Sequence, residues 1–204
     1  REKIVVLGED NISVAKGYNN LGAIYYEVGD YDKSIEYLNK SIEIKELVLG
    51  TTHPDVASGY NNIGLTYLLN DNYIQAEKQF EKALVACKDK GGAVKADTYF
   101  NLGELFFRKG DYSGAADNYK TALDIQNTLF DKDHPTLAKS NIYIGKAMWR
   151  LGFYQRSLDY SKKGLQLLEE NHPNHPIMIN GYAGIGIIYY HIDSLDLALE
   201  YFRK

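Results

Sequence analysis

The sequence predicts an all-α fold, a right-handed α-solenoid of about five antiparallel helix–turn–helix repeats. A pattern of one aromatic or polar residue, two further residues, an aliphatic residue and glycine recurs along the chain and ends at Gly22, Gly64, Gly103, Gly145 and Gly186. These glycines are 39 to 42 residues apart. Self-similarity at such a period is typical of arrays in which each unit buries its apolar face against its neighbours. Within each period, apolar residues recur at helical spacing on both sides of a short polar turn.

Residues 57–88 illustrate why each repeat is expected to be a helical hairpin. Apolar residues follow helical spacing from Val56 to Leu68 and again from Ile74 to Leu84. The polar segment 70–72 separates the two runs, so that a tight turn between two helices is predicted.

The predicted turns share their chemistry across the repeats. One slot, where a helix commonly ends in a left-handed residue, holds Gly29, Asp71, Gly110, Gly152 and Asp193. The next residue is Asp30, Asn72, Asp111, Phe153 or Ser194. All of these except Phe153 carry a side-chain oxygen that can cap the following helix.

The glycines inside the first helices predict close contact between the two helices of each hairpin. A glycine in a helix costs about 1 kcal/mol of stability relative to alanine. Five glycines at the same position of successive repeats therefore need a structural reason. Small residues follow twelve positions later at Ser34, Ala76, Ala115, Ser157 and Ala198. Large residues stand four positions further on at Leu38, Phe80, Tyr119 and Phe202, with Ser161 as the exception. This pairing favours two helices that lock together where the β-carbon is missing.

The entries to the repeats set the expected boundaries. His53-Pro54, His134-Pro135 and His175-Pro176 precede three of the hairpins, where proline suits the first helical turn, and Gly91-Gly92 precedes the third. We expect one array over residues 1–204, with repeats at 13–50, 55–90, 93–130 and 135–171 and an incomplete fifth at 176–204. Residues 1–8 match 43–50 and are expected to be the tail of a preceding repeat, so that the array is expected to continue beyond both ends.

Composition and motifs favour binding over chemistry. The formal charge of −4 does not suggest a nucleic acid partner, and the longest apolar run, 182–190, is too short to span a membrane. The single cysteine, Cys87, favours a reducing, cytoplasmic compartment and a structural thiol. No phosphate-binding loop is present, and the histidines lie mostly in turns about 40 residues apart. We therefore expect no enzymatic activity, no cofactor and no metal site.

The chain resembles the tetratricopeptide repeat family in the order of its landmark residues. The second repeat matches the family pattern nearly throughout, with Tyr60, Ile63, Gly64, Tyr67, Ala76, Phe80 and Ala83. The long period and the segment from Leu49-Gly50 through His53-Pro54 to Tyr60-Asn61-Asn62 are similar to the kinesin light chain variety. The resemblance covers almost the whole chain.

The resemblance implies that the first helices line a concave groove that receives a peptide or helix. It places the asparagines Asn20, Asn62 and Asn101 in one row of this groove, and an amide ladder can bind a peptide backbone. A row nearer the turns contains Tyr26, Phe107, Trp149 and Tyr190, whose rings could anchor side chains. Lys146, together with Lys139 and Arg150, could accept an acidic partner. Co-chaperones of the Hsp70 and Hsp90 type bind a carboxylate through cationic side chains. The corresponding positions of this chain lack those cations and hold Asn19, Ala23, Asn62, Asp97 and Asn101.

Other interpretations of these residues stay open at the sequence level. The asparagines could satisfy neighbouring backbone groups, the aromatic row could pack repeat against repeat, and the lysines could form a solvated face. The first functional hypothesis is a non-catalytic scaffold for protein interaction. The alternative is a sensing or autoregulatory domain of a larger signalling enzyme, such as a fused kinase or caspase-like protease. Exposed ends could also allow end-to-end self-association.

Overall fold

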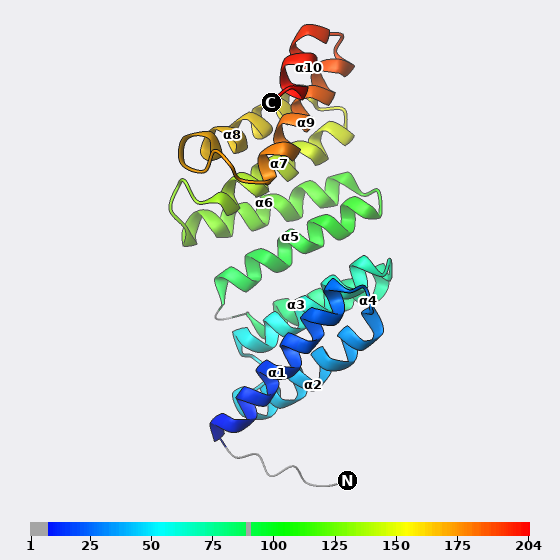
Figure 1. Cartoon of the computed structure of the whole chain (residues 1–204), viewed down its shortest axis with the longest axis vertical. Helices are drawn as coiled ribbons and strands as arrows, with labels where there is room; N and C mark the ends of the chain where they lie inside the picture. Colours follow the sequence, from blue (N-terminus) through cyan, green and yellow to red (C-terminus); the bar gives the residue numbers. More distant parts are fainter. Residues whose placement is uncertain (1–7, 89–90) are drawn as a thin grey trace. The chain divides into compact units, whose positions relative to one another are not determined.

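The computed structural model describes residues 8–88 and 91–204, and within these ranges it contains ten α-helices and no strand (Figure 1). In chain order the helices are α1 (Gly8–Glu27), α2 (Tyr31–Leu49), α3 (Pro54–Leu69), α4 (Tyr73–Ala86), α5 (Gly92–Arg108), α6 (Tyr112–Leu129), α7 (Pro135–Arg150), α8 (Tyr154–Asn171), α9 (Ile177–His191) and α10 (Leu195–Phe202). Odd-numbered helices are the first helices of the predicted hairpins and even-numbered helices are the second. The predicted tail at residues 1–8 lies outside the described residues except for Gly8, where α1 begins.

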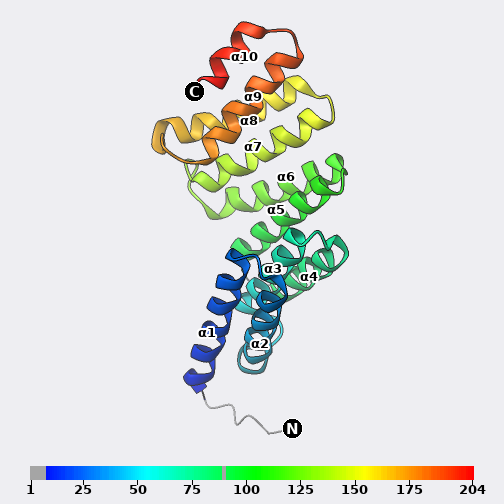
Figure 2. The same cartoon turned by 45° about the vertical axis from the view of Figure 1, so that its right-hand side comes forward.

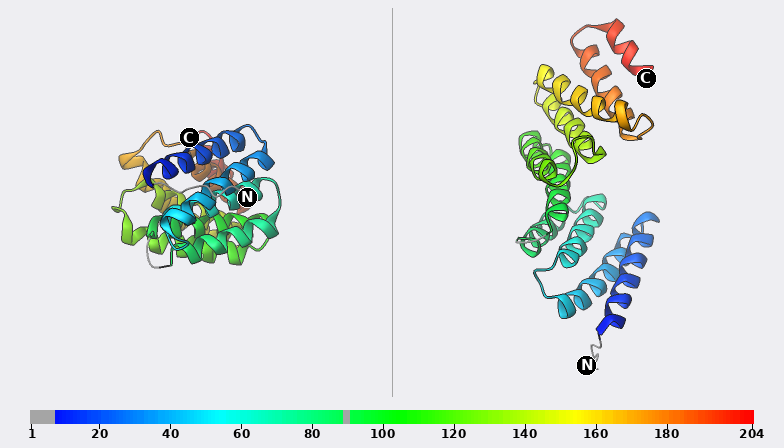
Figure 3. Two further views of the ribbon diagram at one scale, coloured as in Figure 1. Left: turned by 90° about the horizontal axis from the view of Figure 1, so that it is seen from below. Right: turned by 90° about the vertical axis from the view of Figure 1, so that its left-hand side faces the viewer.

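The chain divides into two compact units, residues 1–101 and 102–204, and α5 crosses the boundary. In the first unit α1 packs against α2, α2 against α3, and α3 against α4. Helices α1 and α2 run side by side in opposite directions (Figure 3). The core of this unit joins α2, α3 and the end of α4 through Leu38, Ile42, Val56, Ala57, Ile63, Ala86 and Cys87.

The second unit is built in the same way. Helix α7 pairs with α8, and α9 with α10, while α6 contacts α7 and α8 contacts α9 (Figure 2). The first helices α7 and α9 also touch directly. The core of this unit comprises Ala138, Ile142, Leu158, Leu165, Leu168, Met178, Ile185 and Ile188. Within each unit, successive hairpins therefore bury apolar residues against each other, as the sequence period predicts.

The left-handed residue of each turn is confirmed at every predicted position. The backbone has positive φ at Gly29, Asp71, Gly110, Gly152 and Asp193, the five residues of the predicted slot. The following side chain accepts a hydrogen bond from a backbone N–H in three turns, from Asp30, Asn72 and Asp111. Ser194 occupies the same cap position, but its hydroxyl makes no capping bond, so the expected cap is absent there.

Histidines accept hydrogen bonds at the starts of three helices, a role that the sequence analysis did not assign to them. Nδ1 of His53 accepts a hydrogen bond from the backbone N–H of Asp55, at 3.1 Å. His134 caps α7 in the same way through the N–H of Thr136. Nδ1 of His175 accepts a hydrogen bond from the N–H of Ile177, the first residue of α9, although the N-cap position of that helix is Pro176. The imidazole therefore supplies the acceptor that serine or asparagine usually supplies at a helix start. Proline follows each histidine in the sequence and begins α3 and α7.

The interior glycines face the second helix of their own hairpin, as predicted. A β-carbon on Gly103 would lie 2.5 Å from the ring of Tyr119, and one on Gly186 would lie 2.7 Å from the ring of Phe202. In the fourth hairpin a β-carbon on Gly145 would meet the Ser161 hydroxyl oxygen first and the Ser157 backbone oxygen, at 3.0 Å, next. Helices α7 and α8 thus approach each other through backbone atoms where the ring is missing.

Candidate functional site

The first unit gathers two of its four predicted binding residues around one pocket. Tyr26 from α1 and Asn62 from α3 line a pocket of about 220 Å³, whose lining also includes Leu65 and Thr66. Asn20 is exposed on α1 and does not line this pocket. A partner side chain that entered between α1 and α3 would therefore meet one aromatic ring and one amide.

Asn101, the fourth predicted residue of the first unit, already has a partner inside the protein. Its amide nitrogen donates a hydrogen bond to Oδ1 of Asn61, at 3.0 Å, and Asn61 is buried. This contact links α5 to α3 and agrees with the interpretation in which such asparagines satisfy their neighbours. The side chain of Asn101 is half-buried and offers its carbonyl oxygen for a further bond.

The second unit brings Lys146 and Phe107 into direct contact. Nζ of Lys146 lies 4.2 Å from the centre of the Phe107 ring and 5.3 Å from that of Tyr143. These are cation–π distances, and they hold the ammonium group over the first-helix face. Among the described residues no carboxylate forms an ion pair with Lys146, so its charge is available to a partner.

Arg150 extends this positive surface by one turn of α7. Its guanidinium lies 4.3 Å from the centre of the Tyr112 ring, and it donates a hydrogen bond to the Tyr112 hydroxyl. Lys139, grouped with these cations in the sequence analysis, is exposed near the start of α7 and does not line the pocket described next.

Trp149 and Lys146 line a pocket of about 240 Å³ between α7, α8 and α9. The Trp149 ring also lies 5.8 Å from the ring of His191. Tyr190 is 60% exposed, packs edge-on against His191 and does not line the pocket. The structure therefore brings together three of the four residues predicted in this unit. Lys146 and Trp149 line the pocket, and Phe107 contacts Lys146, whereas Tyr190 lies outside the pocket.

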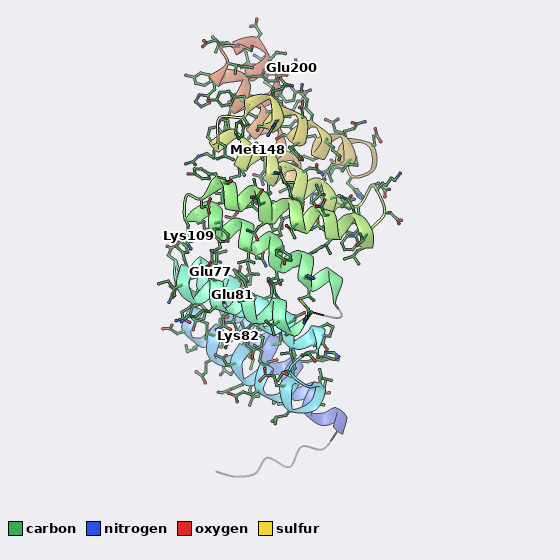
Figure 4. The ribbon with its side chains drawn as sticks, turned by 180° about the vertical axis from the view of Figure 1, so that it is seen from behind. Glu77, Glu81, Lys82, Lys109, Met148 and Glu200 are labelled. Carbon is green, nitrogen blue, oxygen red and sulfur yellow. The ribbon has the colours of Figure 1, made fainter. Side chains whose placement is uncertain are left out.

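The second helices carry a different surface. Glu77, Glu81 and Lys82 lie along α4 (Figure 4), and Glu81 and Lys82 are exposed. They are close to a wider hollow of about 490 Å³ that includes Tyr60 and Glu46. This hollow mixes charges of both signs and contains none of the residues predicted to bind a peptide.

Perturbed ionisable groups in the first unit are explained by packing. Burial and a hydrogen bond to Glu46 raise the pKa of Tyr60 to about 12. Burial lowers the pKa of Lys45, an effect that Asp55 opposes and Lys16 adds to. Burial also raises the pKa of the Cys87 thiol, which is 2% exposed. A buried thiol held in its neutral form is a poor nucleophile.

None of the described helices is both long and apolar enough to cross a membrane. Helical hairpins at a fixed period, joined by one continuous apolar core in each unit, define an α-helical repeat protein. The family model for the tetratricopeptide repeat matches residues 13–89, 58–128 and 94–170. The chain belongs to the tetratricopeptide repeat family, whose fold is a general scaffold for protein–protein interaction, and the expected all-α fold class is confirmed.

Known proteins match the chain at low sequence identity. A Clustered mitochondria protein homolog of Candida albicans is 24% identical over 136 residues, which are 64% of this chain and 9% of that protein. The chain thus corresponds to a small part of that relative's length. The TPR-like repeats of a candidate kinesin light chain from Podosopora anserina match 97% of this chain and 94% of theirs, with a TM-score of 0.78 and 15% identity. YrrB, described as a TPR protein with an unusual peptide-binding site, matches 90% of this chain and 80% of its own, with a TM-score of 0.56 and 17% identity.

Proposed function

We propose that the chain is a non-catalytic scaffold that binds a peptide or helix of another protein along the first helices of its hairpins. The observation that carries this proposal occurs in each unit separately. Tyr26 and Asn62 share a pocket in the first unit, and Lys146 and Trp149 share one in the second. Each pocket is lined by residues of two successive first helices and of the second helix between them.

The chemistry of the two pockets suits peptide binding. The amide of Asn62 can donate to and accept from a peptide backbone, and the half-buried ring of Tyr26 provides apolar contact area. Lys146 adds an unpaired positive charge that complements an acidic residue of the partner. The peptide-binding site ascribed to YrrB, a protein of the same fold, also supports this function.

The experiment that tests the proposal compares two double variants against a captured partner. Affinity capture with the parent protein supplies the partner, and its affinity for this chain is then measured by calorimetry. We expect Asn62→Ala with Asn101→Ala to weaken binding by about tenfold or more, since each lost peptide hydrogen bond is worth about 1 kcal/mol. The melting temperature of this variant must show that the chain remains folded.

Asn39→Ala with Asn127→Ala is the matched control, because both asparagines are exposed on second helices. It should leave the affinity unchanged. An equal loss of affinity in both double variants, or no loss of affinity in either, would show that the first-helix asparagines do not bind the partner.

A second candidate function is a sensing or autoregulatory array within a larger signalling enzyme, such as a kinase or caspase-like protease. It is supported only in that the matched segment makes up 9% of its relative's length, so such repeats occur within a much longer chain. The sequence of the complete parent protein tests this candidate. A parent with tetratricopeptide repeats and no enzymatic domain would exclude it.

We also propose a cytoplasmic location, because Cys87 is the single cysteine and cannot form a disulfide within the chain. Fluorescence microscopy of the tagged, full-length parent tests this location. Signal confined to the secretory pathway would contradict it.

A further inference from the structure

Three of the second helices, α2, α4 and α10, hold a lysine over the first tyrosine of their hairpin. The lysine stands eighteen residues after the interior glycine in each case. The pairs are Lys40–Tyr18, Lys82–Tyr60 and Lys204–Tyr182, with the ammonium nitrogen 5.9, 5.1 and 6.0 Å from the ring centre. These are cation–π distances, so the ring fixes the position of the ammonium group in all three hairpins.

In two of these hairpins the lysine is paired with a carboxylate one helical turn earlier. Nζ of Lys40 lies 2.6 Å from Glu36, and Nζ of Lys204 lies 3.1 Å from Glu200. Helix α4 has Lys78 at this position. The other second helices all have an acidic residue there, namely Glu36, Asp117, Asp159 and Glu200. Like charges one turn apart destabilise a helix, so α4 lacks a carboxylate exactly where its lysines need one.

Lys78 and Lys82 both line the hollow of about 490 Å³ beside α4, and both are exposed. In the part of the chain that the structure describes, neither lysine forms an ion pair. Glu46 lines the hollow too, but its Oε1 accepts the hydrogen bond of the Tyr60 hydroxyl at 2.6 Å. Glu81, next to Lys82 on α4 (Figure 4), is the other carboxylate of the lining. Two unpaired ammonium groups therefore outnumber it.

The same hollow contains an exposed aliphatic side chain. Val85 is 68% exposed and lines the hollow together with Ala86 and the half-buried ring of Tyr60. The corresponding residues of α2, α6 and α8 are polar, namely Glu43, Asp124 and Gln166. Helix α4 thus combines an apolar contact with unpaired positive charge at positions where the other hairpins are polar or acidic. Apolar area rimmed by polar groups is typical of an interaction surface.

We propose that this hollow binds an acidic segment of a partner protein, in which one glutamate or aspartate takes the place that Glu36 has in α2. Its carboxylate pairs with Lys78 and Lys82, and a neighbouring apolar side chain contacts Val85 and the Tyr60 ring. Charge complementarity with the two unpaired lysines specifies the acid. This surface shares no residue with the two first-helix pockets, so it is a second binding surface that goes beyond the proposed function.

The test uses N-acetyl-Glu-Leu-Glu-amide and N-acetyl-Gln-Leu-Gln-amide as probes, which have nearly the same shape and differ in charge. Binding is measured from the backbone amide resonances of the isotope-labelled chain. We expect the glutamate probe to shift the resonances of α4 and to bind about fivefold more tightly than the glutamine probe, as exposed ion pairs would give. Salt at about 1 M should remove this preference.

Lys78→Glu tests the assigned charge. It restores the acid–lysine pair of α2, so the melting temperature should be unchanged or higher, while the preference for the glutamate probe disappears. Lys163→Glu is the matched control, because it makes the same change of charge at an exposed lysine of α8, and it should leave the preference unchanged. Val85→Gln should weaken both probes alike, since they share the leucine.

Equal binding of the two probes to the wild-type chain, or an equal loss of preference in Lys78→Glu and Lys163→Glu, would overturn this inference. The double variant Asn62→Ala with Asn101→Ala separates it from the proposed function and should leave probe binding unchanged. Probe binding that is lost in this double variant would show that the acidic probe binds along the first helices. It would overturn the second surface and leave the scaffold function standing.

Discussion

The ring of Phe80 lies directly against Gly64, so that a β-carbon on this glycine would be only 2.5 Å from Cε1 of the ring. Gly64 belongs to α3, and Phe80, which is fully buried, belongs to α4. The contact locks the two helices of one hairpin at close range. It recurs with other side chains in every hairpin, and it explains why the glycine pattern is tied to the period of the repeat.

The first prediction concerns this contact. Gly64→Ala should destabilise the chain by about 1–3 kcal/mol, because the buried ring has to move and overpacking outweighs the better helix propensity of alanine. Chemical denaturation followed by circular dichroism measures the effect. Gly17→Ala is the control with the opposite sign and should stabilise by up to about 1 kcal/mol. Stabilisation by both substitutions would show that α3 and α4 are not tightly packed here.

The histidine caps lead to a second prediction. His134→Ala should cost about 1 kcal/mol, since the backbone N–H of Thr136 loses its acceptor, whereas His134→Asn should restore most of the loss. Both variants lose the stacking of His134 on Phe130, with ring centres 4.2 Å apart. Their difference in unfolding free energy therefore measures the cap alone. Two variants of equal stability would mean that the imidazole does not cap α7.

The raised pKa of Tyr60 predicts that the folded chain loses stability at alkaline pH. Its hydroxyl donates to Oε1 of Glu46 at 2.6 Å, and its pKa is raised to about 12, whereas an unfolded tyrosine titrates near 10. The folded state holds the proton more tightly. Its stabilising effect is therefore complete below about pH 10 and is lost as the pH rises through about 12. Tyr60→Phe should cost about 1 kcal/mol at neutral pH.

Urea unfolding at pH 7 and at about pH 11 tests this effect, because the difference between wild type and Tyr60→Phe should shrink at the higher pH. Lysine titration affects both proteins alike and cancels in the comparison. A difference that stays constant between the two pH values would contradict the assigned role of the Tyr60–Glu46 bond.

The buried charge of Lys45 is predicted to lower the free energy of unfolding. It is 8% exposed, and its ammonium group donates to the backbone oxygen of Asp55 at a long 3.3 Å. The same register position holds Leu168 in the fourth repeat, where an apolar side chain is fully buried. Lys45→Leu should therefore stabilise the chain by about 1 kcal/mol, as replacement of poorly paired buried charge often does.

Lys163→Leu is the control for this substitution, since Lys163 is exposed on α8 and a surface change should stay within about 0.5 kcal/mol. Thermal and urea unfolding of both variants give the comparison. A destabilised Lys45→Leu would show that the bond to Asp55 outweighs the cost of burial.

Much of this fold could be predicted from the sequence because its signals are local and repeat. Positive φ at Asp71 and Asp193 follows from their place in a turn slot that other repeats fill with glycine. The partner of each interior glycine follows from a fixed spacing along two packed helices. The capping histidines were missed because proline alone explained those positions, whereas the acceptor role of Nδ1 depends on side-chain geometry.

The binding pockets were less predictable. The family resemblance put Tyr26 and Asn62 in separate rows, whereas both line one pocket, and it gave no sign that Asn101 would be held by Asn61. Ser161 stood out as the exception to a pattern of large residues, and that exception was the available signal for the second pocket. The pocket also depends on Gly184, which lies in another helix. The linear pattern does not show that Ser161 and Gly184 line the same pocket.

The central claim is that partners bind along the first helices of the hairpins, and photo-crosslinking tests it most directly. A benzophenone amino acid replaces Tyr190 on α9 or Ile74 on α4, residues that are 60% and 71% exposed, and the captured partner is then added under irradiation. We predict an adduct from position 190 and none from position 74. An adduct formed only from position 74 would contradict the account.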